Sequence, residues 1–127
     1  MKIDHLDHLA ITVRDVEASA KWYENVLGLK RRYTDVWGPV PLMICAGDTC
    51  LALFPSENEN PESLPNTRNT ITMRHFAFRV NRNEFKNAQS DLKEKNIDFR
   101  FEDHTVSHSI YFNDPDGHHL EITTYEI

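Results

Sequence analysis

Cysteine is scarce in this chain, and long apolar runs and an excess of basic charge are missing. The 127 residues include two cysteines, Cys45 and Cys50, which are too few for a disulfide framework. No apolar run approaches the roughly 20 residues that a membrane helix needs, and the first residues lack the layout of a signal peptide. A net charge of −6 repels a phosphate backbone. We therefore expect a cytoplasmic protein with no membrane and no nucleic-acid partner.

Two similar segments show that the chain repeats itself. Residues 8–13 read His-Leu-Ala-Ile-Thr-Val and residues 75–80 read His-Phe-Ala-Phe-Arg-Val, and both alternate like a half-buried strand. A segment with helical spacing follows each one, over residues 16–27 and 84–95. The repeat predicts two modules of the same construction.

Capping residues and glycine turns define the other elements of each module. Asp15 and Asn83 are the expected N-caps, and Gly28 and Asn96 are the expected left-handed stops. Three strands are expected after each helix, over residues 30–36, 41–46 and 49–54, and then 98–102, 107–113 and 119–125. The order is βαβββ twice, which predicts an α+β fold.

The chain length predicts one domain, residues 1–127, that contains both modules. Module one covers about residues 1–55 and module two about residues 71–127. The polar stretch over about residues 55–70 has no hydrophobic period and is expected to be a linker.

Three sequence motifs carry a resemblance to a known family. They are Asp-His-Leu-Ala-Ile-Thr-Val at 7–13, Trp-Tyr-Glu-Asn-Val-Leu-Gly-Leu at 22–29, and Ile-Tyr-Phe-Asn-Asp-Pro-Asp-Gly-His-His-Leu-Glu at 110–121. In this order they resemble the vicinal oxygen chelate superfamily of glyoxalases, bleomycin-resistance proteins and extradiol dioxygenases. The resemblance implies a cupped, mostly antiparallel mixed sheet with helices outside it. It also implies metal ligands on the first and last strands of the modules, and a homodimer.

Strand alternation supports a metal site independently of the resemblance. If the apolar residues of each strand pack against the helices, then His8, His75 and Glu121 all turn to the opposite face. Two imidazoles and one carboxylate hold one divalent ion, Fe, Mn, Zn or Ni. The alternatives are histidines that only pack or face solvent, and a salt bridge from Glu121 to Arg79 or Arg74.

Two further positions bear on the chemistry. Ala52 stands where glyoxalase I-like proteins carry an additional carboxylate, so the metal keeps open positions for substrate. Tyr111 lies on the face of Glu121, and the resemblance implies a catalytic role near the substrate. The alternative for Tyr111 is a tyrosine that only fills the cup. His119 shares this face and either lines the pocket or faces solvent.

The resemblance implies a divalent-metal-dependent enzyme that acts on a small oxygen-bearing substrate, of the dioxygenase or the glyoxalase/lyase type. A fosfomycin-type thiol transferase is disfavoured because Ala10 replaces a hydroxyl residue and because the chain ends at Ile127, before that group's basic segment. The alternative is a binding protein of the bleomycin-resistance type, which holds a small molecule without chemistry.

The turn at Gly47 and Asp48 predicts that Cys45 lies directly opposite Cys50 on paired strands. The main interpretation is a reduced pair that packs as two small apolar residues. The alternative is a redox-sensitive pair beside the metal pocket.

Overall fold

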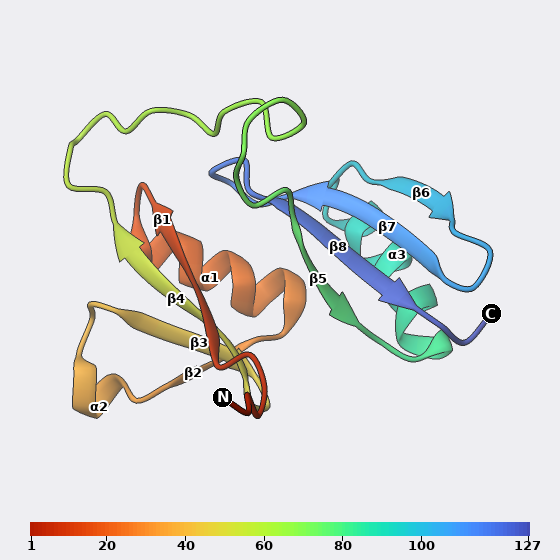
Figure 1. Cartoon of the computed structure of the whole chain (residues 1–127), viewed down its shortest axis with the longest axis horizontal. Coiled ribbons are helices and arrows are strands. Elements are labelled where there is room, and N and C mark those ends of the chain that lie inside the picture. The colour runs from red at the N-terminus through yellow and green to blue at the C-terminus, as the bar shows by residue number, and fades with distance from the viewer. The chain divides into compact units, whose positions relative to one another are not determined.

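Each half of the chain forms a four-stranded mixed sheet with one long helix packed against it. The computed structural model describes residues 1–127 and divides into two compact units, 1–62 and 63–127 (Figure 1). Both units have the order βαβββ, and the first contains one additional short helix. The prediction of an α+β fold built from two βαβββ modules is confirmed.

The first unit has its strands in the spatial order β1-β4-β3-β2, with β1 parallel to β4 and the other pairs antiparallel. Helix α1 packs on β3 and β4, where its Tyr23 is fully buried together with Ile44 and Leu53. The elements are β1 (His8–Val13), α1 (Val16–Leu27), β2 (Lys30–Arg32), α2 (Thr34–Trp37), β3 (Leu42–Ala46) and β4 (Thr49–Pro55).

The second unit repeats this topology, with the strand order β5-β8-β7-β6 and β5 parallel to β8. Helix α3 packs on β8 and contributes the buried Phe85 and Leu92, and Ile110 and Leu120 are fully buried in the sheet. The elements are β5 (Phe76–Arg79), α3 (Arg82–Glu94), β6 (Arg100–Asp103), β7 (His108–Asn113) and β8 (His119–Thr124). No helix of either unit is long and apolar enough to cross a membrane.

The expected helix stops are confirmed, because Gly28 and Asn96 both have positive φ, at 66° and 55°. Asp15 caps α1 as expected, and its side chain accepts a hydrogen bond from the Ala18 amide. The second N-cap was predicted wrongly. Asn81, not Asn83, caps α3 by accepting from the Glu84 amide at 2.8 Å. Glu84 follows Asn81 by three residues, which is the spacing of a capping box.

The strand predicted over 30–36 is also corrected. It ends at Arg32, because Tyr33 adopts φ 61° and turns the chain into the short helix α2. A tyrosine rarely occupies this left-handed region, so alternation alone did not indicate the turn. The remaining strands lie within two residues of their expected bounds.

Cys45 and Cys50 are register partners on β3 and β4, which confirms the predicted pairing. They are joined by a disulfide, so the main interpretation of a reduced pair is corrected. Both are buried, at 3% and 8% exposure. Cys50 is also the register partner of His8 on β1, which places the disulfide beside a predicted metal ligand.

We expect thiol titration of the unfolded protein to find no free thiol before reduction and both cysteines after it. The Cys45→Ala/Cys50→Ala double variant should lose about 2 kcal/mol of unfolding free energy relative to the oxidised protein, since the closed loop is short. Urea unfolding measures this loss, and the reduced wild type is the control. A free-thiol signal in the unreduced protein would contradict the disulfide.

Candidate metal centre

His75 and Glu121 lie side by side because their strands are parallel neighbours. Ala77 of β5 pairs with Glu121 of β8, and His75 stands two residues before Ala77 on the same face. The His75 Nε2 atom lies 2.8 Å from Glu121 Oε2. This is the distance of a direct N–H···O contact between an imidazole and a carboxylate. Two ligand atoms bound to one divalent ion at about 2.1 Å each are separated by roughly 3 Å, so the two side chains are also close enough to share an ion.

Glu121 is a buried carboxylate whose two oxygens both have partners. Its side chain is 11% exposed, and the Ser109 hydroxyl donates a hydrogen bond to Oε1 at 2.5 Å. The ion pair with Arg79 or Arg74 that would explain Glu121 without a metal does not form. Arg79 instead stacks on the Tyr125 ring at 4.5 Å. A buried carboxylate is costly without partners, and here an imidazole and a hydroxyl provide them.

Tyr111 lies directly across the strand pair from Glu121. Its ring packs edge-on against the His75 ring, with centroids 5.7 Å apart, and its hydroxyl is 2.8 Å from His104 Nε2. Burial, followed by the negative charge of Glu121, raises the pKa of Tyr111 above its usual value near 10. The phenol therefore stays protonated at neutral pH and remains able to donate a proton or a hydrogen bond.

His8 lies in the first unit, on the exposed face of β1, whereas Ile11 and Val13 are buried on the other face. Its Nδ1 atom is 2.7 Å from Asp7 Oδ2, the distance at which an imidazole N–H donates to a carboxylate. This contact leaves Nε2 for another partner, as in metal-binding histidines oriented by a carboxylate. The joint ligand set of His8, His75 and Glu121 stays a prediction, because His8 belongs to a different unit.

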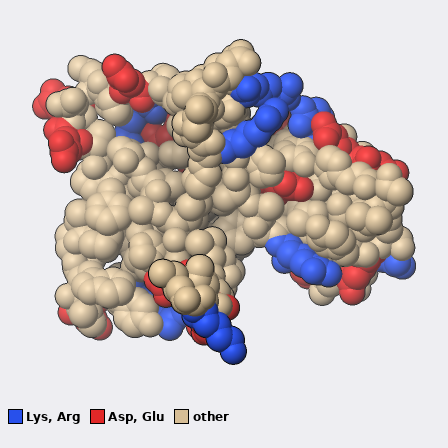
Figure 2. Space-filling model, in the orientation of Figure 1, with Lys and Arg blue, Asp and Glu red and all other residues tan.

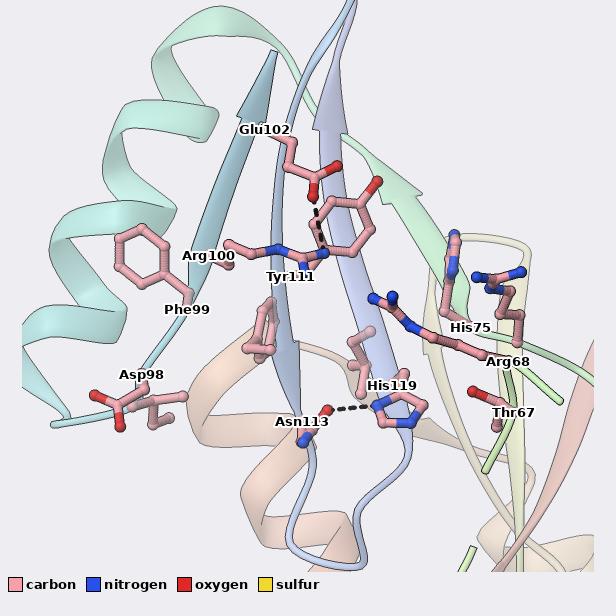
Figure 3. Close-up of a pocket in the computed structure, with 14 residues that line it drawn as sticks. Thr67, Arg68, His75, Asp98, Phe99, Arg100, Glu102, Tyr111, Asn113 and His119 are labelled. Carbon is pink, nitrogen blue, oxygen red and sulfur yellow. Dashed lines mark hydrogen bonds and ion pairs between the residues drawn. The ribbon is translucent and has the colours of Figure 1, made fainter. Parts of the chain in front are cut away.

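A pocket of about 840 Å³ opens beside the His75–Glu121 pair (Figure 3). His75 and Tyr111 line it, and so does His119, whose Nδ1 atom lies 2.8 Å from the Asn113 side-chain oxygen. His119 thus lines the pocket. The other lining residues are Thr67, Arg68, Arg74, Ile97, Asp98, Phe99, Arg100, Glu102, Phe112, Asn113 and Leu120.

Sequence reasoning missed three residues around Tyr111 and Glu121. Ser109 shares the face of Tyr111 by strand alternation, and this parity could have identified it. His104 lies in the connection between β6 and β7, which has no hydrophobic period, and this connection brings it to the Tyr111 hydroxyl. The Arg100 guanidinium lies 5.0 Å from the centre of the Tyr111 ring, because Arg100 pairs with Tyr111 across β6 and β7.

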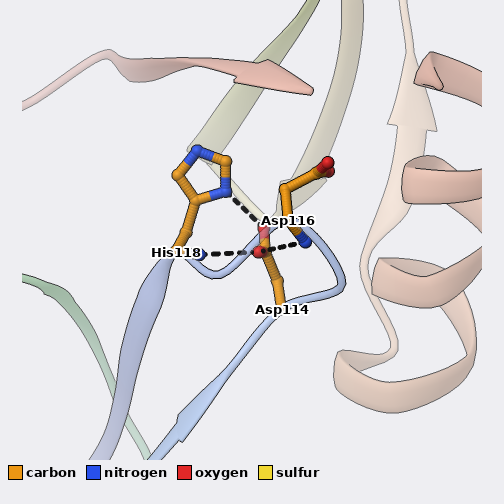
Figure 4. A group of neighbouring side chains, drawn as sticks. All are labelled: Asp114, Asp116 and His118. Atoms are coloured by element: carbon orange, nitrogen blue, oxygen red, sulfur yellow. Dashed lines mark hydrogen bonds and ion pairs between the residues drawn. The ribbon is translucent and has the colours of Figure 1, made fainter. Parts of the chain in front are cut away.

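A second group that could hold a metal ion is formed by Asp114, Asp116 and His118 in the β7–β8 turn (Figure 4). One ligand atom from each lies within 4.8 Å of the others. The fully buried Asp114 carboxylate already accepts hydrogen bonds from the backbone amides of Asp116 and His118, at 3.0 and 2.8 Å. Its other oxygen is 2.7 Å from His118 Nδ1. This pattern is that of an Asx-type turn that holds the hairpin together.

Comparison with known proteins identifies the family of the chain. A sequence model of the Glyoxalase/Bleomycin resistance protein/Dioxygenase superfamily matches residues 5–122. The chain belongs to this superfamily. The metallothiol transferase FosB of Lysinibacillus sphaericus is 31% identical to it, over 98% of this chain and 84% of the transferase. The catechol-2,3-dioxygenase of Bacillus subtilis is also 31% identical, over 93% of this chain and 40% of the dioxygenase.

A solved structure supports the same assignment. The chain matches a glyoxalase/dioxygenase from Nostoc punctiforme with a TM-score of 0.78 and 25% identity, over 97% of this chain and 92% of that one. The relatives named here are enzymes with different reactions. One of them is a thiol transferase, the type that the sequence disfavours for this chain, and another is a dioxygenase.

Proposed function

We propose that this superfamily member is a divalent-metal-dependent enzyme that acts on a small oxygen-bearing molecule. The observation that carries the proposal is the contact of Glu121 with His75, which lines a pocket together with Tyr111. Two ligand atoms 2.8 Å apart, one on an imidazole and one on a carboxylate, suit Fe, Mn, Zn or Ni.

His75 and Glu121, completed by His8, would hold the ion. When bound, the metal supplies a Lewis acid that polarises substrate oxygens. Ala52, the residue at the position of the additional glyoxalase carboxylate, cannot ligate, so a bound ion would keep positions for substrate. The homodimer that the family resemblance implies stays a prediction. In such a dimer, His8 could come from the same chain as His75 and Glu121 or from the partner chain.

The side chains around the metal have distinct roles in this proposal. Ser109 holds one oxygen of Glu121, so that the carboxylate keeps its orientation. Tyr111 is the proposed catalytic residue, and it donates its phenolic proton or a hydrogen bond to a substrate oxygen. In this proposal the Nε2–H group of His104, 2.8 Å from the phenol oxygen, donates to that oxygen and leaves the phenolic O–H for the substrate.

The chemistry in this proposal is of the dioxygenase, the glyoxalase/lyase or the thiol-transferase type. The competing function is a binding protein of the bleomycin-resistance type, which would not need two histidines and a carboxylate together. The His75–Glu121 contact favours the enzyme, because it places two ligand atoms within the span of one ion.

Metal analysis of the His8→Ala variant tests this proposal. We expect it to bind metal more than about 100-fold more weakly than the wild type, because a ligand itself is lost. Unfolding should be unchanged, because the His8 side chain is 45% exposed. His5→Ala is a matched control, since His5 is also exposed and also pairs with a preceding aspartate, Asp4 at 3.1 Å. Wild-type protein that binds no divalent metal, or equal affinity in both variants, would overturn the three-ligand site.

A further inference from the structure

The pocket beside His75 contains an unusual concentration of arginine for an acidic chain. The protein carries a net charge of −6 with only 14 lysines and arginines, yet Arg68, Arg74 and Arg100 all line this one pocket. Figure 2 shows a group of Lys and Arg side chains over the upper part of the second unit. In Figure 3 the side chains of Arg68 and Arg100 both extend into the pocket.

The acidic side chains at the pocket do not neutralise all three arginines. Arg100 is paired with Glu102 at 3.1 Å, and Asp98 lies at the far end of the pocket from Arg68 in Figure 3. Arg68 and Arg74 form no ion pair within the second unit. Two guanidinium groups therefore remain available, and each presents planar donors that match the oxygens of an anion.

We propose that Arg68, Arg74 and Arg100 form a subsite for the anionic oxygen group, carboxylate or phosph(on)ate, of a small molecule bound in this pocket. Arg68 and Arg74 provide the free charge, and Arg100, stacked on Tyr111, anchors the anion beside the phenol. The claim that this molecule is the substrate rests on the proposed function. The claim that the arginines bind an anion is independent of the proposed function.

The test is titration of metal-free protein with inorganic phosphate and, separately, with acetate, at constant ionic strength held by chloride. Shifts of backbone amide and arginine side-chain NMR signals report binding residue by residue. We expect saturable binding of at least one anion by the wild type, with shifts at the pocket. Stronger binding of phosphate assigns the subsite to a phosphate or phosphonate group, and stronger binding of acetate assigns it to a carboxylate.

Charge-removing variants make the subsite falsifiable. Arg68→Gln and Arg74→Gln should each weaken anion binding about tenfold or more, because each removes a charge-assisted contact. Lys86→Gln, which removes an exposed positive charge on α3 outside the pocket, should leave the affinity unchanged. No saturable binding of either anion, or equal affinity in all variants, would overturn the subsite.

The outcome is separable from the metal proposal. His75→Ala should lose metal and still bind the anion, if both proposals are correct. Anion binding that depends on the arginines in a protein that never binds metal would retain the subsite and reject the enzyme proposal. Metal binding without any anion binding would reject the subsite and retain the enzyme proposal.

Discussion

The Glu121→Ala variant is expected to lose metal almost completely. Glu121 is the carboxylate of the proposed set, and its Oε2 atom lies 2.8 Å from the His75 imidazole. Mutation of a residue that hydrogen-bonds to a metal ligand lowers the metal affinity about 10- to 100-fold. Loss of a ligand itself should therefore lower the affinity more than about 100-fold. Elemental analysis after purification, followed by competition with a chelator, measures the loss.

Two variants calibrate that result. Ser109→Ala keeps the carboxylate but removes the hydrogen bond to Oε1, so its affinity should fall only about 10- to 100-fold. Asp116→Asn removes a charged ligand atom from the β7–β8 turn and should leave the metal content unchanged. Full occupancy in Glu121→Ala together with loss in Asp116→Asn would move the metal to the turn and end the proposal for His75 and Glu121.

The Asp114→Ala variant is expected to have the largest effect on stability. Its carboxylate is fully buried and accepts from two backbone amides and the His118 ring. Loss of these bonds leaves buried donors unsatisfied and should cost about 3 kcal/mol. For a chain of this size, that loss lowers the melting temperature by about 10 °C. Calorimetry with and without a chelator measures the shift and shows whether it depends on metal.

The matched control is Asp116→Ala, in the same turn. The Asp116 side chain is only partly buried, so the expected loss is within about 1 kcal/mol. An equal loss of stability in both variants would show that Asp114 has no special role in closing the hairpin. A large shift that appears only when metal is present would assign the turn to metal binding instead.

Much of the second unit's site could be predicted from strand alternation. Glu121 lies between Leu120 and Ile122, which pack inward, and this pattern alone placed the carboxylate on the opposite face of β8. Tyr111 followed from the same reasoning on β7, and the pairing of Cys45 with Cys50 followed from a two-residue turn. Periodicity is a local property, so it can be read without knowing which strands are neighbours.

Other residues at the pocket lie in connections that have no period. Arg68 and Arg74 lie in a stretch without helix or strand, 56–75. Arg68 falls within the predicted linker, and Arg74 was considered only as a partner of Glu121. Their position on the pocket follows from the path of that stretch beside β6, β7 and β8. Tyr33 and Asn81 show the same limit at element ends, where one backbone angle or one side-chain bond decides the boundary.

The sequence by itself determined the two-module order, the inward and outward faces of the strands, and the residue types able to hold a metal. Local hydrophobic periods and caps act over a few residues, so these features are encoded along the chain. Only the tertiary structure decided that Glu121 contacts His75 and Ser109 rather than an arginine. That choice depends on the parallel pairing of β5 with β8, which joins residues far apart in sequence through backbone hydrogen bonds that no local pattern specifies.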